Sequence, residues 1–235
     1  MDLELVLEIV LSLVAVFMAI VLHEVAHGYV AFRLGDPTAR SRGRLTLNPL
    51  AHIDPIGTIA VPIFLALMRI LLQSNIPLLG WAKPVPINPK YFRNPLRGML
   101  YVAAAGPGTN IALAAVAAGL GRLVVLAIPN ELVYGGGGFV DNLLGAVFYL
   151  LSAFVLYNLI LAVFNLIPIP PLDGSRILMY FLPAEGRRIL LSIERYGFII
   201  VLLILYLGLL DPVFHGIWRL WQFLVGLKWL TLLSI

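Results

Sequence analysis

The strongest constraint on the fold is a series of long apolar stretches separated by short basic or proline-rich segments. Residues 5–22 carry a single charged side chain, Glu8. As a helix, a stretch of this length rises about 27 Å, close to the hydrocarbon thickness of a bilayer, about 30 Å. Of the 235 residues, 61% are hydrophobic and 12% are charged, against roughly 45–50% and 25% in soluble domains. The sequence therefore predicts an integral membrane protein.

Further apolar stretches predict a bundle of membrane helices. At about 20 residues for each span, the chain has room for about five or six transmembrane segments and for no large soluble domain. The predicted fold class is an all-α polytopic membrane protein, with residues 1–235 forming a single membrane-embedded domain. Its core covers about residues 5–180, and its C-terminal helices cover about residues 189–232. The other apolar stretches are residues 56–72, 96–128, 142–167, 189–210 and 213–232.

The distribution of positive charge predicts an orientation in the membrane. Lys and Arg gather in residues 33–44, 83–97 and 176–188, and such segments of membrane proteins lie in the cytoplasm. The acidic N-terminus and the glycine-rich link at residues 129–141 are expected outside. Because the basic residues are spread over loops and helix ends, the net charge of +4 does not indicate nucleic-acid binding. The chain has no cysteine, so histidines and carboxylates would have to hold any metal.

Residues 56–72 have basic segments on both sides, which conflicts with a simple span. A re-entrant segment that enters and leaves the membrane on one side would resolve the conflict, because such backbone is tolerated where protein shields it from lipid. The alternative is a full span followed by a return through residues 78–95, which are polar and proline-rich. Proline disfavours a regular helix there. We therefore expect a small membrane-embedded β or re-entrant element.

The motif HEVAH, residues 23–27, lies at the end of the first apolar stretch. His23 and His27 are four residues apart, so on a helix they share one face and can bind one zinc ion. Glu24 lies about 100° around the helix from His23, beside the metal rather than on it. Zinc lowers the pKa of a bound water toward neutral, and a carboxylate can then take its proton. The alternative is a pair of structural histidines that hold helices together.

A catalytic zinc site needs a third protein ligand, and no His, Asp or Glu follows HEVAH before the helix ends. Asp173 is the strongest candidate from the residues alone. Prolines at 168, 170 and 171 break the fourth helix before it, and Gly174 follows it. An aspartate on such a break can face into the bundle. It can equally cap the next helix, and the residues alone leave the two interpretations open.

The motifs together resemble the site-2 protease family of intramembrane zinc metalloproteases. The family pattern is HExxH followed by NxxPxPxLDG, and NLIPIPPLDG, residues 165–174, fits every fixed position. AGPGTN, residues 105–110, lies in an intervening helix. GRLTLNPLAHIDPIGT, residues 43–58, and GWAKPVPINP, residues 80–89, resemble the compact prokaryotic branch without PDZ or CBS domains. The resemblance covers roughly residues 15–180 and implies a multi-pass protein of a prokaryotic cell membrane.

The resemblance implies roles for the matching residues. His23, His27 and Asp173 would bind one zinc ion per chain, and Glu24 would be the general base that later protonates the leaving amine. Asn165 would bind the substrate backbone or stabilise the oxyanion, as an amide donor can. Its alternative role is a structural amide that satisfies carbonyls freed by the prolines. The implied partners are a transmembrane-protein substrate and the lipid bilayer, and the sequence indicates no oligomeric state.

Three further features have less specific expectations. GPxxN, residues 106–110, is expected to be mainly structural, because small residues allow close helix packing. His52 and Asp54 are interpreted as structural or substrate-gating loop residues, with a metal role as the alternative. Lys83, Pro84 and Val85 lie in a strand-like segment that could pair with an unwound substrate by β-augmentation.

The predicted function is hydrolysis of a peptide bond within or near a transmembrane segment of a membrane protein, with the zinc toward the cytoplasmic side. Two alternatives remain open. One is a metal-ion transporter that uses the His/Asp site, although a transporter would more often show repeat symmetry, which the sequence lacks. The other is a relative that binds membrane proteins without cleaving them.

Overall fold

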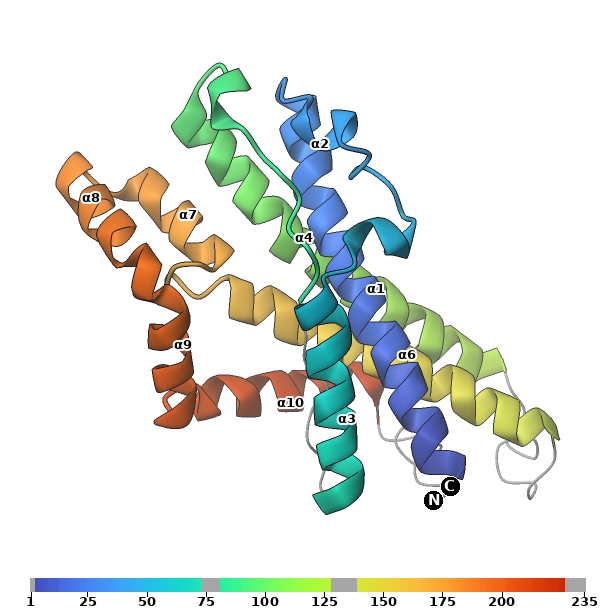
Figure 1. The fold of residues 1–235 in the computed structure, drawn as a ribbon. Helices are drawn as coiled ribbons and strands as arrows, with labels where there is room; N and C mark the ends of the chain where they lie inside the picture. The colour runs from blue at the N-terminus through green and yellow to red at the C-terminus, as the bar shows by residue number, and fades with distance from the viewer. Residues whose placement is uncertain (1–2, 73–80, 128–138, 227–235) are drawn as a thin grey trace.

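The computed structural model describes residues 3–72, 81–127 and 139–226, and helices dominate this part of the chain (Figure 1). The described residues form no β-strand. The longer helices are α1 (Leu3–Arg33), α3 (Val61–Leu72), α4 (Pro95–Ala127), α6 (Phe139–Asn165), α7 (Asp173–Phe181), α8 (Ala184–Ile193), α9 (Gly197–Tyr206) and α10 (Asp211–Val225). The short ones are α2 (Thr38–Ser41), the π-helix η2 (Pro55–Ala60) and the 3-10 helices η1 (Pro49–His52), η3 (Pro89–Tyr91) and η4 (Glu194–Tyr196).

Five helical stretches in the described part of the chain are long and apolar enough to cross a membrane, which agrees with the expected five or six. They are Leu5–Arg33, Pro55–Leu72, Pro95–Leu123, Leu143–Asn165 and Ala184–Tyr206. The expected last span, residues 213–232, corresponds to α10, which turns sharply away from α9 (Figure 1). Residues 227–232 lie outside the described residues, as does most of the glycine-rich link at residues 129–141.

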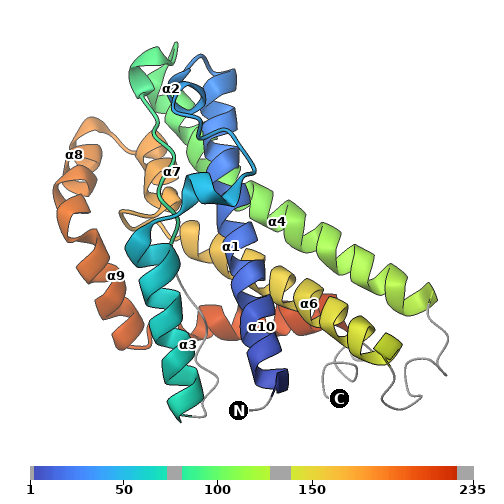
Figure 2. The ribbon, with the colours of Figure 1, turned by 45° about the vertical axis from the view of Figure 1, so that its right-hand side comes forward.

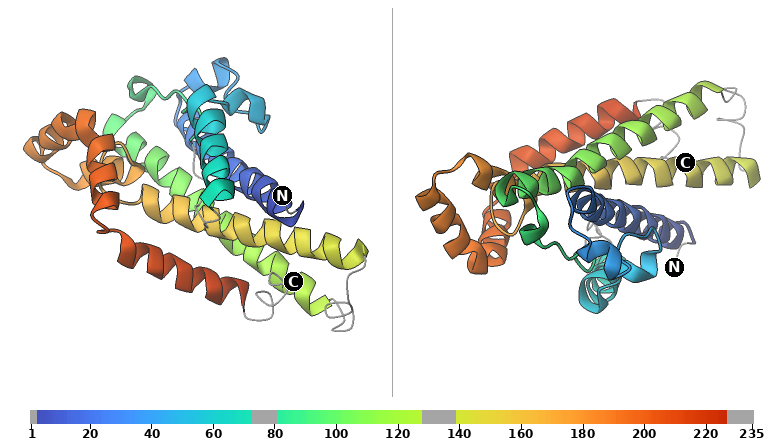
Figure 3. Two further views of the ribbon diagram at one scale, coloured as in Figure 1. Left: turned by 60° about the horizontal axis from the view of Figure 1, so that its bottom comes forward. Right: turned by 90° about the horizontal axis from the view of Figure 1, so that it is seen from above.

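The core of the bundle consists of α1, α4 and α6, each of which packs against the other two (Figures 2 and 3). Ala114, Ala117 and Ala118 of α4 are buried against Phe148 and Val155 of α6. Small side chains let helix backbones approach closely, which membrane bundles need because lipid is as apolar as leucine. This packing holds α1 beside α4, and α7 packs against α4 as well. Elements from both halves of the chain therefore meet at α1.

The segment between residues 81 and 88 is extended, but it pairs with no second strand among the described residues. The β element expected at residues 80–89 is therefore not present in this part of the chain. The backbone N–H groups of Trp81 and Lys83 donate to the carbonyl oxygens of Gly57 and His52, at 3.1 and 3.0 Å. Prolines at 84, 86 and 89 have no N–H to donate, and this interrupts any strand ladder.

A buried arginine joins this extended segment to the loop after α1. The Arg44 guanidinium donates to the carbonyl oxygens of Ala51 and Lys83, and to that of Pro84 at 3.4 Å. The residue is 8% exposed. The three carbonyl oxygens that accept from the guanidinium compensate its removal from water.

Candidate metal centre

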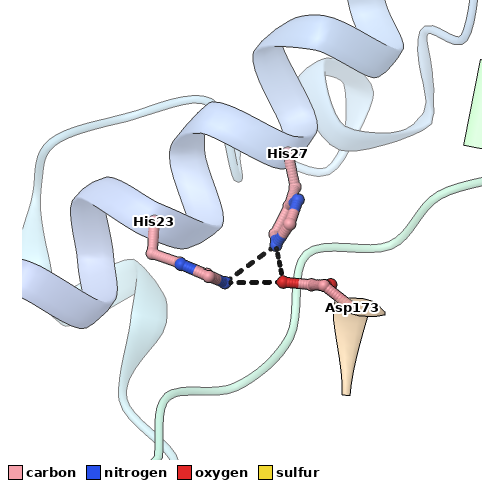
Figure 4. Close-up of side chains that lie close together, drawn as sticks. All are labelled: His23, His27 and Asp173. Atoms are coloured by element: carbon pink, nitrogen blue, oxygen red, sulfur yellow. Dashed lines mark hydrogen bonds and ion pairs between the residues drawn. The ribbon is translucent and has the colours of Figure 1, made fainter. Parts of the chain in front are cut away.

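His23 and His27 of α1 lie one helical turn apart and point to the same side of the helix (Figure 4). They are 5% and 6% exposed, and their Nε2 atoms are 2.9 Å apart. The side chains reach this arrangement because residues four apart share a helix face. The predicted histidine pair therefore lies inside the bundle rather than at its surface.

Asp173 meets both histidines from the start of α7 (Figure 4). Its Oδ2 atom lies 3.1 Å from Nε2 of His23 and 3.2 Å from Nε2 of His27. Leu172 occupies the N-cap position, and no side chain makes a capping hydrogen bond there. The capping alternative for Asp173 is therefore wrong. The prolines after α6 end that helix, and the chain turns back toward α1 before α7 begins.

Gly174 makes this position of Asp173 possible. A Cβ atom added at Gly174 would lie 2.3 Å from the carbonyl oxygen of Leu166 and 2.5 Å from that of Ile167. Only a glycine allows the first turn of α7 to lie this close to the end of α6. Gly106 of α4 has a similar role on the other side of the site, because its Cβ would lie 2.5 Å from Nε2 of both histidines.

The hydrogen bonds of the two imidazoles aim their Nε2 lone pairs at Asp173. Nδ1 of His27 lies 2.7 Å from the carbonyl oxygen of Val102, and Nδ1 of His23 lies 2.5 Å from Oδ1 of Asn110. Both oxygens can only accept, so Nδ1 of each ring carries a proton, and Nε2 is the ring atom left to bind a metal.

The arrangement fits a tetrahedral metal ion. Ligand atoms about 2.0–2.1 Å from a tetrahedral zinc lie about 3.3 Å apart, and the three separations here are 2.9, 3.1 and 3.2 Å. Asp173 Oδ2 is buried and receives no hydrogen bond from the described residues. Three electron-rich atoms this close repel one another unless a cation lies among them. His23, His27 and Asp173 therefore form a possible metal site with one position left for a water or a substrate.

Glu24 lies outside this triad and meets the extended segment. The backbone N–H of Val85 donates to Oε2 of Glu24 at 2.8 Å. Lys83 donates its N–H to His52, and Pro84 has none to donate. Of the three residues expected to bind substrate, Val85 therefore contacts Glu24, and the N–H groups of Lys83 and Val85 are already used within the chain.

Among the described residues, Asn165 makes no hydrogen bond to His23, His27 or Asp173. It is half-buried, and its Nδ2 donates to the carbonyl oxygen of Leu161 at 3.0 Å. His52 and Asp54 are likewise outside the triad. Nε2 of His52 donates to the Thr46 carbonyl at 2.9 Å, and Asp54 Oδ1 accepts from two N–H groups at the start of η2. Both residues thus have structural partners in the loop.

Sequence reasoning missed Asn158 and gave Asn110 only a packing role. Asn110 touches His23 directly, and its Nδ2 donates to Oδ1 of Asn158 at 2.7 Å. Both asparagines are fully buried. The available signal was their position in apolar helices, since polar side chains inside a membrane bundle need partners there.

Comparisons with known proteins relate the chain to a family of peptidases. Peptidase family M50 matches residues 74–208, a range that includes Asp173 and begins after HEVAH. The chain is 36% identical over 192 residues to "Putative zinc metalloprotease YwhC" of Bacillus subtilis. These 192 residues make up 81% of this chain and 78% of that protein.

Two further relatives carry the name "Putative zinc metalloprotease Rip2". The Mycolicibacterium smegmatis protein is 33% identical over 80% of this chain and 63% of its own length. The Mycobacterium tuberculosis protein is 32% identical over 83% of this chain and 66% of its own length. No solved structure matches the chain significantly. A family match over more than half of the chain, together with the high coverage of YwhC, shows that this multi-pass membrane protein belongs to peptidase family M50, the site-2 protease family of metalloproteases.

Proposed function

We propose that this chain is a zinc endopeptidase that hydrolyses a peptide bond within or near a transmembrane segment of another membrane protein. The observation that carries the proposal is the convergence of His23, His27 and Asp173 inside a bundle of apolar helices. Membership of a metalloprotease family supports the reaction class, and the apolar surroundings support a membrane-embedded substrate. One zinc ion per chain is the expected stoichiometry.

The reaction divides between the metal and Glu24. When bound, zinc would polarise the scissile carbonyl and lower the pKa of the attacking water. Glu24 would accept a proton from that water and then donate it to the leaving amine. The Val85 N–H at 2.8 Å holds one oxygen of this carboxylate, which leaves the other oxygen for the proton transfer. Glu24 is thus kept beside the triad without becoming a ligand.

The substrate would approach along the extended segment. A transmembrane helix must unwind before hydrolysis, because helical hydrogen bonds shield its carbonyl groups. Val85 contacts Glu24, and Lys83 and Pro84 precede it in the extended segment, so the unwound substrate would lie against these three residues. Asn165 would contact the substrate backbone or the oxyanion through its amide, after giving up its bond to Leu161.

We further propose that the active site faces the cytoplasm and that residues 56–72 form a re-entrant segment, which enters and leaves the membrane on one side. Trp81 donates its N–H to Gly57, and the Thr58 hydroxyl donates to the Trp81 carbonyl at 2.9 Å. The start of this segment therefore lies beside Trp81, which follows it in the chain, and this supports a re-entrant path. Residues 1–235 would form one metalloprotease domain, with a core at about residues 5–180.

Zinc content and cleavage together test the proposal. The protein is purified in detergent as wild type, Glu24→Gln, Asp173→Ala and, as a control, His215→Ala, an exposed histidine of α10. Wild type, Glu24→Gln and the control should each hold about one zinc per chain, and Asp173→Ala should lose it. Cleavage of a tagged single-span protein reconstituted in the same liposomes should stop with Glu24→Gln. Undiminished zinc in Asp173→Ala, or cleavage that survives Glu24→Gln, would contradict the proposal.

A further inference from the structure

A chain of hydrogen bonds runs from His23 through two helices without touching the other two candidate ligands. Nδ1 of His23 donates to Oδ1 of Asn110 at 2.5 Å, and Nδ2 of Asn110 donates to Oδ1 of Asn158 at 2.7 Å. Nδ2 of Asn158 donates to the carbonyl oxygen of Phe154 at 2.7 Å. The chain crosses from α1 to α4 and α6, and both asparagines are 0% exposed.

The direction of every bond in this chain follows from its last member. The Phe154 carbonyl can only accept, so Asn158 must turn its NH2 group toward it and its oxygen toward Asn110. Asn110 must then present its NH2 group to Asn158 and its oxygen to His23. A side-chain oxygen at this distance requires a proton on Nδ1 of His23, which leaves Nε2 bare for a metal.

Asn110 alone fixes this direction less firmly. The only other acceptor described for its Nδ2 is the Ala19 carbonyl, at 3.4 Å, the limit of a hydrogen bond. Without Asn158, the amide could rotate and offer its NH2 group to His23, which would favour the tautomer with a proton on Nε2. His27 has no such dependence, because a backbone carbonyl, that of Val102, accepts from its Nδ1.

We propose that Asn158 is a positioning residue of the metal centre: it acts through Asn110 to fix the orientation and the tautomer of His23 and so raises the affinity for zinc. The inference rests on the proposed zinc function and assigns a role to a residue that, among the described residues, makes no hydrogen bond to a candidate ligand. Partners of metal-bound histidines typically change metal affinity by about 10–100-fold. Because Asn158 acts one bond farther out, we expect an effect near the lower end.

The chain offers a matched control for this role. Ser152 is also a buried polar residue of α6, 3% exposed, and no hydrogen bond joins its side chain to Asn110 among the described residues. The protein is purified in detergent as wild type, Asn158→Leu and Ser152→Ala, and its zinc dissociation constant is measured by competition with a chelator. Asn158→Leu should raise the dissociation constant about 10-fold, and Ser152→Ala should leave it unchanged.

A second readout separates tautomer control from simple packing. In zinc-free protein with ¹⁵N-labelled histidine, the wild-type His23 ring should carry its proton on Nδ1, and a His23→Gln variant identifies its signals. Asn158→Leu should move part of the population to the Nε2–H tautomer, whereas a purely structural loss would not change the tautomer.

The outcomes distinguish the two proposals. Equal zinc affinity and an unchanged His23 tautomer in Asn158→Leu would overturn the role of Asn158 and leave the protease proposal intact. Failure of the wild type to bind zinc would instead overturn the proposed function, and the tautomer measurement would still decide whether Asn158 controls His23. If Asn158→Leu does not fold, Asn158→Ser, which keeps an oxygen but shortens the reach, should show the same direction of change.

Discussion

Replacing Gly106 by alanine tests how closely α4 encloses the metal centre. An added Cβ would lie 2.5 Å from Nε2 of His23 and of His27, whereas ordinary contacts begin at 3.4 Å. The rings would therefore have to retreat by 3.4 − 2.5, or about 0.9 Å. Metal sites tolerate ligand displacements of only about 0.2 Å. We expect Gly106→Ala to weaken zinc binding on the order of 100-fold or more, beyond the usual effect of changing a ligand's hydrogen-bond partner.

Gly108 provides the control for this prediction. It lies on the same helix, and a Cβ added there would meet nothing within 4 Å. Replacing glycine by alanine inside a helix stabilises it by about 1 kcal/mol, so Gly108→Ala should bind zinc as the wild type does and melt at an equal or higher temperature. The assay is chelator competition on detergent-purified protein, with the thermal midpoint of the zinc-free form as the check on folding. Wild-type zinc affinity in Gly106→Ala would refute the reasoning.

Three more predictions concern the elements around the triad. Val85→Pro removes the N–H that holds Glu24, so the turnover number should fall about 10-fold or more, as expected for a hydrogen bond to a charged group, with zinc content unchanged. Ile87→Pro, at a position whose N–H has no hydrogen bond among the described residues, should have a smaller effect in the same cleavage assay. Gly174→Ala should push the start of α7 away from α6 and reduce zinc occupancy, and Gly186→Ala on α8, where a Cβ makes only ordinary contacts, should not; equal occupancy in both would contradict this. Removal of zinc from the wild type should lower its thermal midpoint, because an ion present at 100 times its dissociation constant adds about 2.7 kcal/mol; an unchanged midpoint would mean that no ion had bound.

Sequence reasoning predicted the parts of this protein that depend on local pattern. The apolar stretches predicted membrane helices, and α1 includes HEVAH as expected. The helical period alone predicted that His23 and His27 share one face. Proline spacing predicted that α6 would end before Asp173. The β element was wrong for the described residues, because residues 81–88 are extended but pair with single loop carbonyls and with Glu24 rather than with a strand.

The sequence by itself determined that the chain spans a membrane and that two histidines share a helix face, since length, hydrophobicity and the 3.6-residue period act within one segment. Only the tertiary structure excluded the capping role of Asp173, because the residues alone left two roles open and only the packing of α7 placed its carboxylate within 3.2 Å of both histidines. It also decided the bond between Val85 and Glu24 and the chain from His23 to Asn158. These contacts join residues far apart in the sequence, and their geometry exists only once α1, α4, α6 and α7 have packed together.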